Sequence, residues 1–309
     1  IRLYINGTEV TVFSARSNPA QNLATVVNLA GEVHVIGKNA SASLYLDTYL
    51  ADVHFIDGQQ LAATSFGETD DNGQWVAKEY AAEDESDLVM TYEDSLVSST
   101  NATAYTFSSA DLGTADANRY IAVAISTHGA AGRTVSSVTI NGVTANVGVK
   151  QGNAANEDFV QIAWAHVPDD ATGDIVITYS GSMNGTGIGI YRIIGEPHLH
   201  DIDGIGIVGT AGQTNVNTVS GGVIINVTHN SNTASFSYTG ITERYDEVED
   251  GSHYHSGASD TVTTGAAQVS VLATCSSSSA IAVQTISFAP GKAYGTNGFR
   301  LDFATSSFF

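Results

Sequence analysis

The sequence predicts an all-β protein, and three observations lead to that class. Short runs rich in Val, Ile, Thr, Tyr and Phe alternate with Gly, Asn, Asp and Ser, which is typical of strands separated by turns. Two Asn-Gly pairs stand between apolar runs, as in tight hairpins. No stretch has the apolar spacing of an amphipathic helix. Many short strands of this kind predict antiparallel sandwiches or jelly rolls.

Tight hairpins are expected at Asn6-Gly7 and at Asn141-Gly142. Both central residues of a type I′ turn need a positive φ, and Asn followed by Gly adopts that geometry at the least cost. The first turn joins Arg2–Ile5 to Glu9–Phe13, and the second joins Val135–Ile140 to Val143–Val149. The other strands expected, in chain order, are Val33–Ile36, Leu50–Ile56, Tyr120–Ser126, Val160–His166, Asp174–Tyr179, Gly187–Ile194, Gly222–His229, Ala234–Tyr238, Gln268–Thr274 and Ala280–Phe288.

The composition excludes several classes of protein and of site. The 309 residues include 11 Lys and Arg and 32 Asp and Glu, so the formal net charge is −21. This acid excess argues against binding of nucleic acid or of an anionic membrane through a basic face. The single cysteine excludes an intrachain disulfide framework and a Cys-based structural zinc site. No apolar run approaches the roughly 20 residues of a membrane-spanning helix.

The composition also changes along the chain. Residues 66–87 are acidic and poor in aliphatic side chains, so we expect a linker or a long loop there. Residues 196–221 are rich in glycine, which predicts a second break or a long excursion within one sandwich. Ser276–Ser279 is expected to form the tip of a hairpin between two strands.

Residues 1–66 contain three strings in a characteristic order, namely LYINGTEV at 3–10, VIG at 35–37 and LADVHFIDG at 50–58. This order resembles the C-terminal half of a laminin-G or concanavalin-like jelly roll. The resemblance implies that the other half precedes Ile1 in a longer polypeptide or comes from a neighbouring chain. The strand character that begins at residue 1 also leads us to expect that this chain is a piece of a longer polypeptide.

Three further strings, FGET at 66–69, GQWV at 73–76 and YGTNGFRLDF at 294–303, resemble a stretch in structural proteins of tailed bacteriophages. In those proteins the corresponding pieces lie close together after the lectin-like domain. Here a long stretch separates Tyr80 from Tyr294, so we expect that a domain is inserted between the pieces. Insertion at an exposed loop adds little loop-closure entropy.

The expected organisation therefore has four parts. Residues 1–65 form the C-terminal half of the lectin-like jelly roll, and residues 66–82 form a linker. Residues 83–290 form an inserted antiparallel β-sandwich, either as one domain or as two halves split near 196–221. Residues 291–309 are the return segment. The predicted fold class is all-β, a partial concanavalin- or laminin-G-like jelly roll plus an inserted, jelly-roll-like sandwich.

Two His-x-His pairs, His198 with His200 and His253 with His255, are the candidate metal ligands. Residues i and i+2 of a strand point to the same face, so each pair could chelate one ion together with nearby carboxylates. The alternative is that these histidines are hydrogen-bonded or solvated in polar loops. We expect no cofactor, apart from a metal ion if these pairs bind one.

No catalytic residue is expected. The acidic runs Glu83–Asp87 and Asp246–Asp250 are typical of solvated loops, and the chain lacks the Glu-x-Asp-x-x-Glu strand of concanavalin-like glucanases. Cys275 is interpreted as a half-buried small side chain, because no His-containing nucleophile signature accompanies it. Trp75 and Trp164 could line a sugar-binding face, although the core of a sandwich explains most aromatic side chains.

These features predict a non-enzymatic structural protein on the exterior of a virion. The resemblance implies a bacteriophage tail fibre, spike or other appendage component that attaches to host-surface glycan. Its expected partners are other copies of itself in a homo-oligomer such as a trimer, other virion proteins and the glycan, with no nucleic acid and no membrane insertion. The alternatives are a capsid decoration or head-fibre protein, a polysaccharide depolymerase on a lectin-like scaffold, and a cellular adhesin or surface-layer module.

Overall fold

The structure is a computed structural model of the chain, and it describes residues 3–14, 36, 45, 53–55, 61–78, 87–155, 157–264, 268–291 and 299–301. The part described is all-β, and every strand pair in it is antiparallel, which confirms the predicted fold class. Its helical element is η1, a single 3-10 turn at Ala63–Ser65. No helix among the described residues is long and apolar enough to cross a bilayer.

The chain divides into two compact units. The first combines Ile1–Asp84 with Lys292–Phe309, and the second is the continuous segment Glu85–Gly291. The second unit nearly coincides with residues 83–290, where the sequence predicts an inserted sandwich, and that it is an insertion stays a prediction. That the first unit is half of a lectin-like jelly roll stays a prediction.

The first unit contains two short hairpins. Strands β1 (Tyr4–Ile5) and β2 (Thr8–Glu9) form the hairpin predicted at Asn6-Gly7, with φ values of 48° and 75° that suit a type I′ turn. Strands β4 (Gly67–Thr69) and β5 (Trp75–Ala77) form a second hairpin where a linker at 66–82 is expected. Its turn is ordered by Asp70, whose Oδ1 accepts hydrogen bonds from the backbone N–H groups of residues 72 and 74.

The first unit also joins distant parts of the sequence. Strand β3 (Val53–Phe55) pairs with β21 (Phe299–Leu301), which comes from the end of the chain. The expected strand Val33–Ile36 lies outside the described residues except for Ile36, and Tyr80 and Tyr294 lie outside them as well.

The second unit consists of two halves that meet at Gly195-Glu196. The first half has β6 (Val89–Ser98), β7 (Ala102–Asp111), β8 (Arg119–Gly129), β9 (Val135–Ile140), β10 (Val143–Thr144), β11 (Asn146–Val147), β12 (Gln151–Gly152), β13 (Phe159–His166) and β14 (Thr172–Ile194). The second half has β15 (Pro197–Val216), β16 (Val223–Asn230), β17 (Phe236–Thr239), β18 (Glu243–Val248), β19 (Tyr254–Thr261) and β20 (Val269–Pro290).

The two halves share one pairing scheme. In the first half, the last strand β14 pairs with β7 and β9 along its first part and with β6 and β8 along its second part. In the second half, β20 pairs with the end of β15 and with β17, and then with the start of β15 and with β16. Strand β13 pairs with β8 as β19 pairs with β16. The two halves therefore have the same order of strand pairing, in which β15 takes the place of β6 and β7.

Long bent strands account for the errors in the sequence-based expectations. Asp174–Tyr179 and Gly187–Ile194 are parts of one strand, β14, and Gln268–Thr274 and Ala280–Phe288 are parts of β20. Ser276–Ser279 is therefore not a hairpin tip. The register of β15 and β20 shifts between Gly209 and Ala211, so both strands bend there and continue. Most of the glycine-rich range 196–221 is likewise strand β15 rather than a break.

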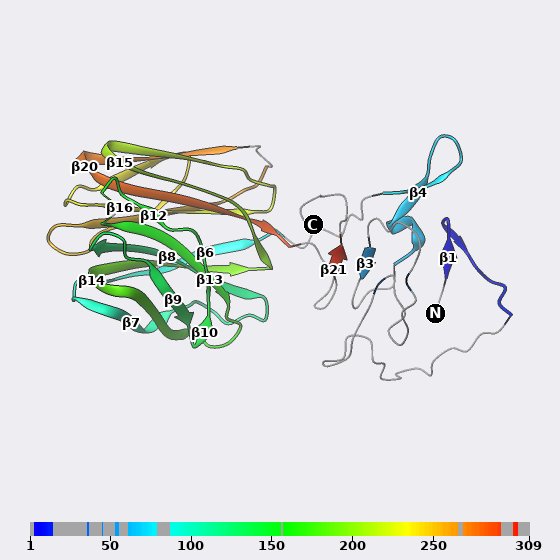
Figure 1. Cartoon of the computed structure of the whole chain (residues 1–309), viewed down its shortest axis with the longest axis horizontal. Coiled ribbons are helices and arrows are strands. Elements are labelled where there is room, and N and C mark those ends of the chain that lie inside the picture. Colours follow the sequence, from blue (N-terminus) through cyan, green and yellow to red (C-terminus); the bar gives the residue numbers. More distant parts are fainter. Residues whose placement is uncertain are drawn as a thin grey trace. The chain divides into compact units, whose positions relative to one another are not determined.

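Apolar cores lie within and between the halves. One core fills the first sandwich, between β7 and β9 on one side and β8 and β13 on the other. A second core lies between the halves, where alternate residues of β8, β13 and β14 face alternate residues of β16 and β20. Two smaller clusters fill the second sandwich. Figure 1 shows β15, β16 and β20 on one side of this unit and β7, β9 and β10 on the other.

Candidate functional site

A cluster of three histidines and three carboxylates lies where the two halves of the second unit meet. Strand alternation explains how it forms. In β8 the even-numbered residues from Ala122 to His128 face the second half, and in β16 the odd-numbered residues from Val223 to His229 face the first. The cluster consists of His128, Asp158, His229, Glu249, Asp250 and His253.

Glu249 lies at the centre of the cluster and is completely buried. Its Oε1 is 3.0 Å from Nδ1 of His128, and its Oε2 is 3.5 Å from Nδ1 of His229. The hydroxyl of Ser126 lies 2.8 Å from the same Nδ1 of His229. One carboxylate therefore orients both histidines and leaves the Nε2 atoms of both rings for other partners.

Two aspartates face those Nε2 atoms. Oδ2 of Asp250 is 3.0 Å from Nε2 of His128, and its Oδ1 is 2.9 Å from Nδ1 of His253. Oδ2 of Asp158 is 3.5 Å from Nε2 of His229 and accepts a hydrogen bond of 2.9 Å from Nδ2 of Asn153. His253 therefore lies near both Asp250, which contacts His128, and Asp158, which faces His229.

The charges of the buried groups are strongly coupled. Burial alone would raise the pKa of the Glu249 carboxyl, but the adjacent imidazoles of His128 and His229 lower it to about 2. Burial likewise opposes ionisation of Asp158, and the nearby His229 still lowers that pKa to about 2. For His229, burial favours the neutral ring, but the carboxylates of Asp158 and Glu249 raise its pKa to about 9. The cluster is therefore a network of ion pairs.

This arrangement can hold a cation but is poorly suited to nucleophilic catalysis. Ser126 and His229 lie at the distance of a serine–histidine pair, yet both are completely buried, so no substrate carbonyl can reach the hydroxyl. Two sets of three residues could each hold an ion, because the ligand atoms within a set lie within 4.8 Å of one another. The first set is His128, Asp250 and His253, and the second is Asp158, His229 and His253.

Of the four histidines expected to bind metal, the structure places His253 in this cluster and the other three elsewhere. The ring of His255 is buried, and its Nε2 lies 3.5 Å from Oε2 of Glu247. His198 is exposed on β15, 3.7 Å from Glu196, and His200 is exposed as well. Among the described residues, neither His-x-His pair falls within one set of ligand atoms. His253 precedes β19 whereas His255 lies within it, and the register of β15 shifts at His200, so the alternation expected of a regular strand does not hold in either pair.

The prediction that Asp246–Asp250 is a solvated loop is wrong. Its first three residues belong to β18, and Glu249 is buried. Sequence reasoning also missed His128, Asp158 and His229, because they come from separate strands. A usable signal existed, since Thr127-His128 and Thr228-His229 end equivalent strands of the two halves.

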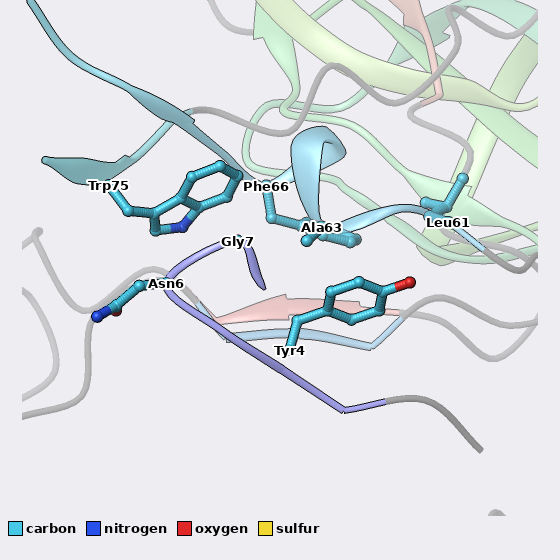
Figure 2. Close-up of a pocket in the computed structure, with 7 residues that line it drawn as sticks. All are labelled: Tyr4, Asn6, Gly7, Leu61, Ala63, Phe66 and Trp75. Carbon is cyan, nitrogen blue, oxygen red and sulfur yellow. The ribbon is translucent and has the colours of Figure 1, made fainter. Parts of the chain in front are cut away.

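The first unit has a second candidate site, an open pocket of about 280 Å³. Figure 2 shows its lining residues, with the indole of Trp75 above the turn at Gly7 and the ring of Tyr4 below Ala63. The pocket is lined by Tyr4, Asn6, Gly7, Leu61, Ala63, Phe66 and Trp75.

Two glycines leave the space that the indole of Trp75 occupies in this pocket. A Cβ on Gly7 would lie 2.4 Å from the indole, and a Cβ on Gly67 would lie 2.6 Å from it. The ring is therefore packed against the turns and strands of both hairpins while remaining partly exposed. Trp164 differs, because it packs edge-on against Phe288 in the core between the halves, with ring centroids 5.2 Å apart.

No family model matches the chain, and no curated protein matches it. Among solved structures, the chain is similar to the extracellular domain of ANXUR2 from Arabidopsis thaliana, with 8% identity and a TM-score of 0.21 over 78% of this chain and 97% of that one. The extracellular domain of ANXUR1 from the same plant gives 8% identity and a TM-score of 0.22 over 79% and 97%. Scores this low carry no argument about fold or function.

Proposed function

We propose that this chain is a non-enzymatic structural component on the exterior of a virus particle, an appendage protein that attaches to host-surface glycan. The observation that carries the proposal is the pocket around Trp75. Its walls come from the Tyr4–Gly7 hairpin and from the Phe66 and Trp75 strings, which are the sequences that resemble lectin-like and phage structural proteins. Strings that lie far apart in the sequence thus form one compact unit.

The chemistry of the pocket suits a sugar. The apolar face of a pyranose can pack on the flat, partly exposed rings of Trp75 and Tyr4, because both sides shed water on contact. The exposed Asn6 amide offers hydrogen-bond donors and an acceptor for sugar hydroxyls. One shallow pocket binds weakly, and the expected homo-oligomer would raise avidity by presenting several copies.

The second unit suits a passive module carried by the first. Asp87 and Pro290 lie near the two ends of the second unit, and both are close to Gly221. A Cβ on Gly221 would be 2.3 Å from Oδ1 of Asp87 and 3.2 Å from Cγ of Pro290. Ends this close let a long segment be accommodated with little change in the protein that carries it.

Glycan binding is tested with the full chain on an array of bacterial surface glycans. We expect Trp75→Ala to abolish binding and Trp75→Phe to retain part of it, with both variants checked for folding by circular dichroism. Val208→Ala, which trims an exposed apolar side chain of the second unit, is the matched control and should bind as the parent does. Equal binding by Trp75→Ala and the parent would contradict the proposed pocket.

The virion assignment needs a separate experiment. Mass spectrometry of purified virus particles should detect the polypeptide, and its absence from them would contradict the assignment. A gold label on the chain, viewed by electron microscopy, distinguishes a tail appendage from a head fibre. Release of reducing ends from host capsule by the pure protein would favour a depolymerase instead.

A further inference from the structure

We propose that the second unit binds one divalent transition-metal ion of the zinc class between Asp158, His229 and His253, and that this ion joins its two halves. This inference is independent of the proposed glycan binding, which concerns the first unit. It rests on the spacing of the ligand atoms, on one unsatisfied buried nitrogen and on the way Glu249 orients the histidines.

The spacing fits an ion better than a direct hydrogen bond. Nε2 of His229 and Oδ2 of Asp158 are 3.5 Å apart, which is long for an N–H···O hydrogen bond. Two ligand atoms about 2.1 Å from a tetrahedral zinc ion are separated by roughly 3.4 Å. A ligand atom of His253 lies within 4.8 Å of both, so small side-chain shifts bring three ligands around one point.

Within the cluster, one buried nitrogen lacks a hydrogen bond. His229 is completely buried, and its Nε2 makes no hydrogen bond with any described residue and faces Oδ2 of Asp158 only at 3.5 Å. Buried polar atoms are almost always satisfied, so an orphan of this kind needs an explanation. A metal ion supplies one, because it displaces the proton from Nε2, accepts the lone pair and offsets the negative charge of the carboxylates in place of that proton.

Glu249 acts as the outer support that metal-binding histidines usually have. It faces Nδ1 of His128 directly at 3.0 Å, and Nδ1 of His229 at 3.5 Å, where the Ser126 hydroxyl lies 2.8 Å from that nitrogen and 3.4 Å from the carboxylate. A carboxylate on the far nitrogen fixes the ring orientation and makes the other nitrogen a better ligand. Both rings therefore present Nε2 toward the aspartates and His253.

The ligands come from both halves of the unit. Asp158 precedes β13 in the first half, whereas His229 is the next-to-last residue of β16 and His253 precedes β19 in the second. His128 and Asp250 form a second set of ligand atoms with the same His253. An ion bound here would therefore crosslink the halves beside their common apolar core.

The donor set also selects the class of ion. Two imidazoles and one carboxylate suit zinc and its neighbours, whereas calcium and magnesium prefer ligand sets made of oxygen alone. The side chains of His253 and Asp250 are 21% and 26% exposed, so an ion can enter from that side.

The test uses the full chain, stripped with EDTA and dialysed. Titration with Zn²⁺ should show one equivalent bound and raise the thermal midpoint of the second unit, and Ca²⁺ at the same concentration should do neither. Co²⁺ should give the visible absorption bands of a tetrahedral site. No saturable uptake of Zn²⁺ would overturn the proposal.

Variants locate the ion. His229→Ala and His253→Ala should each abolish the cobalt bands, and His253→Ala, at a partly exposed position, is expected to fold even if His229→Ala does not. Glu249→Gln should weaken Zn²⁺ affinity by about 10- to 100-fold. The matched control is the double variant His198→Ala and His200→Ala, which removes an exposed His-x-His pair and should bind as the parent does. Loss of binding in that control, or full binding by His253→Ala, would place the ion elsewhere and refute the proposal.

Discussion

The imidazole rings of His128 and His253 stack with their centroids 3.8 Å apart and their planes within 12° of parallel. His128 belongs to the first half of the second unit and His253 to the second half, so the contact crosses the boundary between them. Asp250 touches both rings, with an oxygen 3.0 Å from His128 and another 2.9 Å from His253. Polar pairs therefore hold the halves together alongside the apolar core.

Glu249 is the carboxylate on which this boundary depends most. We expect Glu249→Gln to destabilise the metal-free protein by about 3 kcal/mol, because it leaves the buried His229 with only one of its two compensating carboxylates. Urea unfolding in the presence of EDTA, followed by circular dichroism, measures the change. Glu157→Gln alters an exposed glutamate of the same unit and should change stability by less than about 0.5 kcal/mol. Equal stabilities of the two variants would show that Glu249 is not a structural partner.

Asp246 should make stability depend on pH. Burial raises the pKa of its carboxyl from 3.8 to about 6, although the backbone N–H of Phe236 donates to it. Because the folded state holds the proton more tightly, stability falls as pH rises from about 4 to 6 and stays lower above that range. Asp246→Asn removes this loss and should stabilise the protein at pH 7 by about 1 kcal/mol, a value reduced for partial solvent exposure.

The measurement for Asp246 is thermal unfolding at pH 4 and at pH 7. The variant should gain relative to the parent only at the higher pH. Asp169→Asn, at an exposed aspartate, serves as the control and should show no such difference. A gain that is the same at both pH values would point to a cause other than the carboxyl proton.

Arg119 is a buried side chain that satisfies several carbonyl groups. Its guanidinium donates to the backbone oxygens of Val167 at 2.7 Å, Gly113 at 2.7 Å and Asp170 at 2.6 Å, among others. A lysine cannot reproduce this fork of donors, so Arg119→Lys should cost about 3 kcal/mol of unfolding free energy. Arg244→Lys, at a partly exposed arginine, should cost less than about 1 kcal/mol in the same denaturation experiment.

Two glycines in equivalent turns separate a steric effect from a backbone effect. Gly7 and Gly142 have φ values of 75° and 78°, but only at Gly7 would a Cβ meet the ring of Trp75, at 2.4 Å, whereas nothing lies within 4 Å at Gly142. Gly142→Ala should therefore cost about 1 kcal/mol from its positive φ alone. Gly7→Ala should in addition displace Trp75, seen as a shift in tryptophan fluorescence and a loss of glycan binding. An unchanged emission spectrum would argue against the close packing of this turn.

Local sequence patterns predicted the turns and many of the strands. They did not predict the long strands that bend and continue through a register shift. Asn6-Gly7 and Asn141-Gly142 form the hairpins expected, because the turn geometry depends on those two residues alone. The serines at 276–279 are equally compatible with a turn and with a bulge, so their sequence did not distinguish a hairpin from the bend of β20.

The candidate site was harder to predict for a similar reason. His253 stood out as part of a His-x-His pair, but strand alternation in that pair implied a shared ligand set that the structure does not have. His128 and His229 lie far apart in the sequence, and only the packing of β8 against β16 brings them to the same carboxylate. A comparison of the two halves strand by strand would have matched Thr127-His128 with Thr228-His229.

The contact of β8 with β16 joins strands that hold the same place in the pairing scheme of the two halves. Each half covers a buried apolar face of the other, so either half alone would expose that face to water. A chain cut at Gly195-Glu196 is therefore expected to yield two fragments that aggregate separately and regain solubility only when they are mixed.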